Sequence, residues 1–355
     1  MRIWAQGLGV GLLAAGMVWA QEAPGPEVRQ CSICHGKREF KKVQPDGSVR
    51  PLFVDERELK ASVHARWHCL DCHADIKTIP HPERLEKVNC QRCHFPGNPV
   101  GAPEEVNYEG YVESVHGRLQ RAGNPKAPRC QDCHGAHGVR KASDPNSLVY
   151  KRQIPATCGK CHPQVLEVYQ RSVHGTTLLV RGNNDAPSCS DCHGEHQILP
   201  RKEQASEVSA TQIPETCGHC HGSLEFNQKY DIPVNPVKTF KHSFHGIANE
   251  LGSMRVANCA SCHTAHAVLP PSDPESSVHP ANIPKTCGKE GCHPGANVNY
   301  ARGRFHIDPS RRDAGVVYWV ALFFKYLTVS TLAALILHIL LDLRSKLQKR
   351  AQGHE

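Results

Sequence analysis

Cysteine and histidine recur together at a fixed spacing along this chain of 355 residues. Every one of its 18 cysteines belongs to a pair, and a histidine directly follows the second member of each pair. Two residues separate the cysteines in eight pairs and four separate them in the last: Cys31/Cys34, Cys69/Cys72, Cys90/Cys93, Cys130/Cys133, Cys158/Cys161, Cys189/Cys192, Cys217/Cys220, Cys259/Cys262 and Cys287/Cys292. The histidines that follow are His35, His73, His94, His134, His162, His193, His221, His263 and His293. Two thiols and an imidazole at this spacing can attach a cofactor or bind a metal.

The C-x-x-C-H spacing is typical of covalent haem attachment. The two thiols form thioethers with the vinyl groups of one haem, and the adjacent histidine binds one face of the iron. Half of a zinc site or a disulfide pair is the alternative for a single string. Nine strings that use every cysteine favour haem. The expanded motif of Cys287 and Cys292 is assigned a haem because it occupies the place of CGKCH and CGHCH in a repeat, the alternative being a degenerate site without cofactor.

Histidine is also the predicted ligand on the other side of each iron, because only Met254 remains once a predicted signal peptide is removed. A histidine three residues after a motif lies about one helical turn further along the same face, so it must serve a neighbouring haem. The nine predicted distal ligands are His64, His116, His174 and His245 in S-x-H strings, His137, His196 and His266 in C-H-x-x-H strings, and His81 and His306. The sequence leaves open which of them serves which haem. The other histidines are interpreted as solvated or packed: His68, His219, His242, His279, His338 and His354.

Three repeats follow one another, each with two cysteine pairs and two extra histidines. We expect a mainly α, loop-rich fold organised around haems, with a hairpin at the Pro-Asp-Gly turn of residues 40–54. Segments such as 163–175 are predicted to be helices that carry His174 near their C-terminal end, where Gly175 terminates them. The predicted divisions are a signal peptide (1–20), a three-haem region (21–110), two tandem repeats (111–222), a third repeat with His306 (223–310), a transmembrane helix (311–343) and a cytoplasmic tail (344–355).

The composition indicates an interior that ordinary side chains do not fill. Aromatic residues make up 6% of the chain, and 28 Gly and 26 Pro break it into short elements. The formal net charge of +8 suggests nucleic acid or anionic lipid as a partner. Haem propionates would cancel this excess, and basic clusters with interleaved aromatics are lacking. We therefore predict no nucleic-acid partner.

Two apolar segments predict export and membrane anchoring. Residues 1–20 combine an early Arg2, an apolar stretch and small residues at the predicted cleavage site. This combination is typical of a secretory signal peptide. Residues 316–341 exceed the roughly 20 residues needed to cross a bilayer. An N-terminal export signal then implies an N-out, C-in orientation, with the body on the periplasmic side of the cytoplasmic membrane.

The expected membrane helix carries two ionisable residues, Lys325 and His338. Such residues at membrane depth are candidates for function, and His338 is a candidate ligand of a haem b shared with a partner subunit. The alternative is a helix-end histidine that snorkels or packs on a neighbour. His306 lies ten residues before Val316, so a haem bound by it is expected near the membrane and is predicted to be where electrons enter or leave.

The repeated SVHG, CxDCHGxH and IPxTCGKCH strings cover residues 59–306 and resemble the periplasmic multihaem c-type cytochromes of anaerobic and metal- or nitrogen-compound-respiring bacteria. The chain is similar to a membrane-anchored, nine-haem member of that family. The resemblance implies a row of stacked haems between a membrane quinol-oxidising system and a soluble periplasmic or outer partner. Membrane-anchored tetrahaem quinol dehydrogenases are similar in role, but they have an N-terminal anchor and fewer haems.

Electron transfer is the leading functional prediction, because two histidines per iron leave no position for substrate. A multihaem enzyme of the nitrite-reducing or hydroxylamine-oxidising kind, with one open iron, is the alternative. A single helix is too little to build a quinol pocket, so we expect an integral membrane partner such as a b-type cytochrome.

Overall fold

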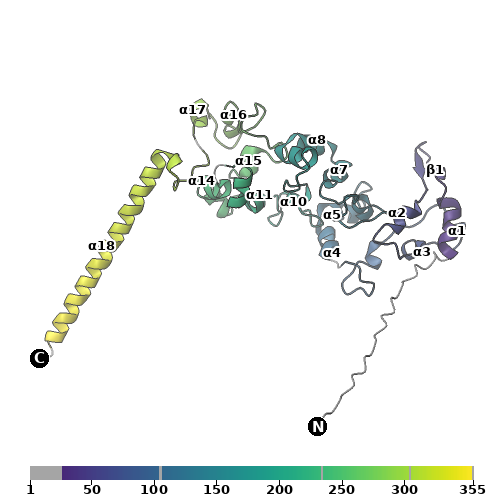
Figure 1. Cartoon of the computed structure of the whole chain (residues 1–355), viewed down its shortest axis with the longest axis horizontal. Coiled ribbons are helices and arrows are strands. Elements are labelled where there is room, and N and C mark those ends of the chain that lie inside the picture. The colour runs from purple at the N-terminus through teal and green to yellow at the C-terminus, as the bar shows by residue number, and fades with distance from the viewer. Residues whose placement is uncertain (1–25, 104–105, 233–234, 304, 354–355) are drawn as a thin grey trace, which may run out of the picture. The chain divides into compact units, whose positions relative to one another are not determined.

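The computed structural model describes residues 26–103, 106–232, 235–303 and 305–353 (Figure 1). The predicted signal peptide and His354 lie outside the described residues. Short helices joined by loops dominate, which confirms the mainly α, loop-rich fold. The α-helices are α1 (Pro26–His35), α2 (Glu56–Lys60), α3 (Cys69–Cys72), α4 (Val106–Glu113), α5 (Val115–Arg121), α6 (Cys130–His134), α7 (Ile154–Gly159), α8 (Pro163–Arg171), α9 (Val173–Gly175), α10 (Ser190–His193), α11 (Ile213–His221), α12 (Leu224–Lys229), α13 (Pro236–Lys241), α14 (Phe244–Glu250), α15 (Cys259–His263), α16 (Ile283–Cys287), α17 (Val298–Ala301) and α18 (Val316–Gln352). Single turns of other helix types are η1 (Cys90–Arg92), η2 (Thr176–Val180) and η3 (Arg312–Ala314).

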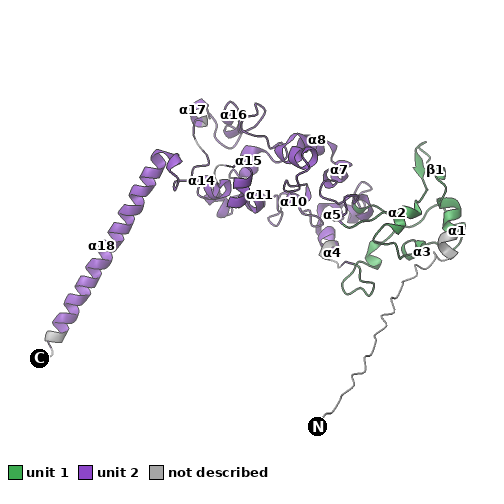
Figure 2. Cartoon of the chain, viewed as in Figure 1, with its two compact units in different colours: residues 1–102, 134–141 green, residues 103–133, 142–355 purple. Residues whose placement is uncertain are grey.

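The chain divides into two compact units (Figure 2). The first comprises residues 1–102 and 134–141, and the second comprises residues 103–133 and 142–355. Residues 134–141 follow the fourth cysteine pair in the sequence, yet they belong to the first unit. The predicted domain boundaries took no account of such an exchange, because they followed the repeats in sequence order.

A small antiparallel hairpin lies where the Pro-Asp-Gly turn predicted it. Strand β1 (Lys41–Val43) pairs with β2 (Val49–Pro51), with Val43 opposite Val49. Gly47 in the turn has φ +81°, a left-handed conformation that glycine adopts without steric cost. The Asp46 carboxylate accepts the backbone N–H of Ser48 at 2.9 Å, as expected for an aspartate-initiated turn.

The interior contains few apolar side chains. Among the described residues the buried hydrophobic ones are Tyr169, Leu178, Ala186 and Ala210. Buried polar residues are more numerous, and most of them are serines that hydrogen-bond to nearby backbone, such as Ser172. Hydrophobic packing of this extent does not order a chain of this length, because roughly 1–2 kcal/mol of backbone entropy is lost per residue. Bound groups must therefore supply much of the interior, as the composition indicated.

The S-x-H-G strings begin helices, so the predicted placement of His174 at a helix end was wrong. Helix α8 ends at Arg171, and Ser172 starts a new turn, its Oγ accepting the backbone N–H of Gly175 at 3.0 Å. The hydroxyl also donates to the carbonyl of Tyr169 at 2.7 Å. Serine is a favoured N-cap because its side chain satisfies an N–H that the first helical turn leaves free. His174 therefore lies in the first turn of the second helix.

Glycine is required in these strings for close packing at the junction between two helices. A Cβ atom built at Gly175 would overlap the carbonyl oxygen of Tyr169. The same overlap occurs with Tyr111 at Gly117 and with Phe240 at Gly246. The glycine thus lets one helix begin directly against the end of the previous one, which orients the histidine before it.

Helix α18 is the one described helix that is long and apolar enough to cross a membrane. Its apolar stretch from Val316 to Arg350 has no part buried against the rest of the protein. The short turn η3, whose Arg311 and Asp313 side chains pair at 2.9 Å, precedes it. The apolar segment predicted from the sequence is therefore a single continuous helix.

Candidate haem-binding sites

The predicted iron ligands lie in pairs. Eight pairs of histidine rings, each with one proximal and one distal candidate, have centroids 5.9–6.4 Å apart. They are His35/His81, His64/His94, His73/His137, His116/His162, His174/His221, His193/His266, His245/His293 and His263/His306. None of the histidines interpreted as solvated or packed takes part in these eight pairs.

The separation of the rings fits one iron between each pair. A metal–imidazole bond is about 2 Å long, and the ring centre lies about 1 Å beyond the nitrogen, so two axial imidazoles have centroids about 6 Å apart. A zinc site would instead gather three or four ligands, and the described residues contain no such cluster of His, Cys, Asp and Glu. All eighteen cysteines are described, and none forms a disulfide. The residues present therefore fit haem better than either alternative.

The pairing follows a rule along the repeats. Each S-x-H histidine pairs with the second motif of its own repeat, as His174 does with His221. In contrast, a C-H-x-x-H histidine pairs with the first motif of the preceding repeat, as His266 does with His193. His306 occupies the corresponding place for His263 in the third repeat. Sequence reasoning named these residues but did not pair them.

A repeated backbone hydrogen bond explains how one repeat reaches the previous one. The N–H of Val173, next to His174, donates to the carbonyl of Val268, two residues after His266, at 2.9 Å. The equivalent bonds join Val115 to Ile198 and Val63 to Val139, both at 2.9 Å. Each bond holds the C-H-x-x-H string of one repeat beside the S-x-H string before it. This backbone contact thus places the C-H-x-x-H histidine, such as His266, beside the proximal histidine of the earlier repeat.

The aspartate inside the C-x-D-C-H motif orders the attachment helix, a role that the sequence analysis missed. The Asp191 carboxylate accepts the backbone N–H of Ser188, just before Cys189, at 2.7 Å. Asp132 and Asp71 make the same 2.7 Å bond to the residue before their own first cysteine. The recurrence of Asp at one position was the available sequence signal, since an acidic side chain in the first turn satisfies free N–H groups and the helix dipole. The two thiols and the histidine are thereby held on one short helix.

The threonine of the IPxTC strings anchors the second attachment helix of each repeat. Thr157, Thr216 and Thr286 donate to the carbonyls of Leu148, Glu207 and Ser277 at 2.7, 2.6 and 2.7 Å. Each bond spans nine residues and closes a loop between the first and second motifs. The second attachment helix of each repeat is therefore fixed to the loop that precedes it.

Protein side chains leave five of the predicted attachment cysteines exposed. They are Cys34, Cys72, Cys133, Cys161 and Cys292, whereas the others, such as Cys93, are half-buried. The attachment turns are nevertheless formed, since the N–H groups of Cys93 and Cys161 each donate to the carbonyl of the first cysteine of their pair at 3.2 Å. The Cys34 carbonyl likewise accepts the N–H of Lys37 at 3.2 Å. The assignment of the exposed thiols to haem therefore rests on their motifs and stays a prediction.

Three predicted ligands have their Nδ1 atom hydrogen-bonded, which leaves Nε2 to bind a metal. His35 Nδ1 lies 2.7 Å from the carbonyl of Leu52. His306 Nδ1 lies 2.9 Å from the hydroxyl of Thr239, and His81 Nδ1 lies 2.9 Å from the carbonyl of Pro82. Partners of this kind fix the tautomer and the ring orientation of a metal ligand.

Burial keeps the candidate ligands neutral. It lowers the pKa of His174 to about 4, with the nearby His221 adding to the shift. Burial also lowers the pKa of His193, His263 and His306. Desolvation disfavours the charged imidazolium, and a metal binds only the neutral ring. These rings are therefore ready to bind iron near neutral pH.

Successive attachment sites of the second unit contact one another. The Cys189 thiol donates a hydrogen bond to the Cys158 sulfur, which lowers the pKa of Cys158. The Cys217 thiol makes the same contact with Cys259, whose pKa is lowered in turn. The fifth site thus adjoins the sixth, and the seventh adjoins the eighth.

His279, which is not a predicted ligand, has a local structural role. The Nδ1 atom of His279 accepts the backbone N–H of Ala281 at 3.3 Å within a turn. This contact supports the interpretation of His279 as a packed residue.

Comparison with known proteins agrees with this geometry. Residues 124–166 match the family described as the doubled CXXCH motif. The high-molecular-weight cytochrome c of Nitratidesulfovibrio vulgaris is 23% identical over 318 residues, which cover 75% of this chain and 51% of that protein. These matches support a place for this chain in the multihaem c-type cytochrome family. The cytochrome is also 23% identical to the nine-heme cytochrome c of Desulfovibrio desulfuricans over 157 residues, 44% of this chain and 42% of that protein.

The cytochrome spans about half the length of the curated relatives it matches. No solved structure matches it significantly. The cysteine motifs and the relatives together support the binding of haem c.

Proposed function

We propose that this cytochrome is an electron carrier with nine covalently bound haems, each held between two histidines. The observation that carries the proposal is the set of eight proximal and distal ring pairs at the spacing of axial ligands. The ninth haem is assigned to the one remaining motif, which ends at His134, and His196 stays a predicted distal ligand. The name of the nine-heme relative is consistent with this number.

The chain's own residues determine what such a site can do. Paired cysteines would fix a haem in place, and the two histidines of each pair would hold its iron. The bound haem would supply one-electron chemistry. Because protein side chains would hold the iron on both sides, the eight paired sites would offer no position for a substrate. This favours a carrier over a nitrite- or hydroxylamine-type enzyme.

We further propose that helix α18 anchors the protein to the cytoplasmic membrane, with the haem-binding part on the periplasmic side. The length and exposure of α18 support this assignment. The pairing of His306 with His263 connects the eighth motif to the segment that leads into α18. The proposed electron route has two further members. One is an integral membrane partner such as a b-type cytochrome, linked to the quinone pool, and the other is a soluble periplasmic or outer partner.

A haem b bound by His338 remains a separate proposal. His338 is exposed on α18, so a partner helix has access to it. Purification of the membrane complex from wild-type and His338→Ala cells tests the idea. Loss of the haem b spectrum from the variant is expected, and an unchanged spectrum contradicts it.

Mass spectrometry of the exported protein tests the haem number. We expect the polypeptide to carry nine haem masses, and a Cys287→Ser, Cys292→Ser double variant to carry eight. The matched control, Ser143→Ala, changes an exposed serine outside the motifs and should keep nine. Fewer than nine haems on the wild-type protein, or a predominantly high-spin ferric spectrum, would contradict the proposal, because bis-histidine iron is low-spin.

A further inference from the structure

Helix α14 of the third repeat presents an apolar stripe to solvent. Phe244, Ile247 and Leu251 are 81%, 51% and 84% exposed. Phe244 and Ile247 lie on one face of α14, and Leu251, the residue that caps its C-terminal end, continues that face. We call these three residues the α14 stripe.

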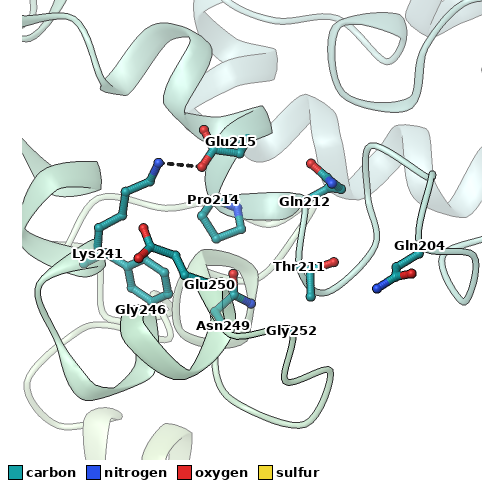
Figure 3. A pocket seen from close by; sticks show the side chains of 11 residues that line it. Gln204, Thr211, Gln212, Pro214, Glu215, Lys241, Gly246, Asn249, Glu250 and Gly252 are labelled. Carbon is teal, nitrogen blue, oxygen red and sulfur yellow. Dashed lines mark ion pairs between the residues drawn. The ribbon is translucent and has the colours of Figure 1, made fainter.

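The opposite face of α14 packs against the protein. Asn249 is buried, and its amide donates to the carbonyl of Ala210 at 2.9 Å. Glu250 lines a polar pocket of about 490 Å³, which is bounded by the ion pair between Lys241 and Glu215 at 2.5 Å (Figure 3). The polar face thus makes the contacts that hold α14 in place, and the stripe points away from them.

The position at which the stripe begins is partly covered in two earlier repeats. Val173 of the second repeat and Val115 of the first are half-buried, and their N–H groups are bonded to Val268 and Ile198. Val63, bonded to Val139 in the same way, is 47% exposed. The residues after the third repeat do not form a fourth one, so Phe244 lacks this cover. End repeats normally present a polar outer face, and a larger apolar residue here implies another cover.

The chain that follows the third repeat ties this region to the membrane anchor. Asp308 lies 3.8 Å from Lys238 of α13, and His306 lies 2.9 Å from Thr239 of the same helix. Eight residues then lead from Asp308 to Val316, a reach of at most about 28 Å. Helix α14 follows α13 after two residues, so the stripe is held near the start of the apolar span.

We propose that the α14 stripe inserts into the membrane surface beside the anchor. The proposal rests on the membrane anchoring by α18 proposed above. Three side chains expose roughly 400 Å² at most, which is small beside the about 800 Å² that each partner buries in a stable protein interface. A short apolar face of this size suits a membrane interface, into which such helices sink by about 5–10 Å.

Insertion would bring one haem site to the membrane surface. His245 lies on α14 next to Phe244, their ring centroids 6.1 Å apart, and it pairs with His293 at 6.0 Å. The last site in the chain is therefore carried by the same helix as the stripe. A lipid-soluble or membrane-embedded electron donor would meet this site first.

Lipid photo-crosslinking of the full-length holoprotein tests the proposal. The protein is reconstituted in nanodiscs that contain a phospholipid with a diazirine on its acyl chain, irradiated, digested and analysed by mass spectrometry. We expect adducts on residues 244–251 as well as on α18. A Phe244→Ser, Leu251→Ser variant should lose most adducts at 244–251, several-fold or more, and keep those on α18.

The matched control is Val43→Ser, Val49→Ser in the hairpin, where the side chains are 63% and 53% exposed. It should leave the adducts at 244–251 unchanged. Haem content and a low-spin spectrum report folding of each variant, and Leu251→Ser alone gives a milder second test. Adducts on α18 without any at 244–251 would overturn the proposal. That result would mean that a haem or a partner protein, and not lipid, covers the stripe. Absence of adducts on α18 as well would overturn the anchoring itself.

Discussion

At the scale of single residues, the paired imidazoles differ in their relative orientation. The rings of His193 and His266 are nearly parallel, with 8° between their planes. Those of His64 and His94 are crossed at 78°. Parallel axial rings split the energies of the two iron d orbitals that overlap with them, whereas crossed rings leave these orbitals nearly degenerate. The sites are therefore chemically distinct although their ligands are identical.

Low-temperature EPR of the ferric protein measures this difference. We expect a strongly anisotropic low-spin signal from the His64/His94 site, together with rhombic signals from the near-parallel sites. The change His64→Ala should remove one haem's share of the anisotropic signal and produce a high-spin signal in its place. His279→Ala is the control and should leave the spectrum unchanged. An anisotropic signal that survives His64→Ala would contradict the assignment.

At the scale of elements, the repeats rely on abrupt junctions between short helices. Ser172 caps the new helix while Gly175 makes room for the carbonyl of Tyr169. The Tyr169 hydroxyl also donates to the carbonyl of Pro187 at 2.7 Å, which ties the junction to the next attachment motif. Short helices of this kind are not stable alone, so each junction is held by its tertiary contacts.

Substitution of Gly175 by alanine should destabilise the protein, against the usual trend. Alanine in place of glycine within a helix normally stabilises by about 1 kcal/mol. At Gly175 the added methyl group overlaps the carbonyl of Tyr169, so we expect a loss of about 2 kcal/mol or more in the free energy of unfolding. Guanidinium unfolding followed by circular dichroism measures it.

The control for that substitution is Gly138→Ala. A Cβ at Gly138 meets only the side chain of Glu58, at 3.6 Å, so stability should change by no more than about 0.5 kcal/mol. Equal stabilities of the two variants would show that the junction tolerates the methyl group.

At the scale of the whole molecule, the proposed anchor and the predicted haem-binding residues occupy separate parts of the chain. Helix α18 has no part of its apolar stretch buried against the remaining chain. The haem-binding residues from Cys31 to His306 all precede it. Their structure should therefore not depend on the anchor.

Truncation after Gly315 tests this separation. We expect the truncated protein to leave carbonate-washed membranes and appear in the soluble periplasmic fraction, with its haem content and EPR spectrum unchanged. Removal of the tail 344–355 alone should leave the protein in the membrane, because the apolar stretch is retained. A truncated protein that stays quantitatively membrane-bound would contradict anchoring by α18.

Features encoded by contiguous residues were predictable from the sequence. Covalent attachment needs only the five residues of a motif such as Cys189 to His193, and the Pro-Asp-Gly turn specified the hairpin locally. The apolar helix from Val316 was likewise readable, because its length and composition are local properties. The break of the predicted helix 163–175 at Ser172 was missed, since a capping serine and a mid-helix serine differ in the contacts they make.

The pairing of axial histidines required the folded chain. His266 follows His193 by 73 residues, and the two meet because a backbone hydrogen bond from Val173 to Val268 lays one repeat against the next. No local pattern encodes such a contact, since it depends on where separate segments pack. The exposure of the α14 stripe is equally a property of the whole fold, because it follows from the lack of a fourth repeat over Phe244.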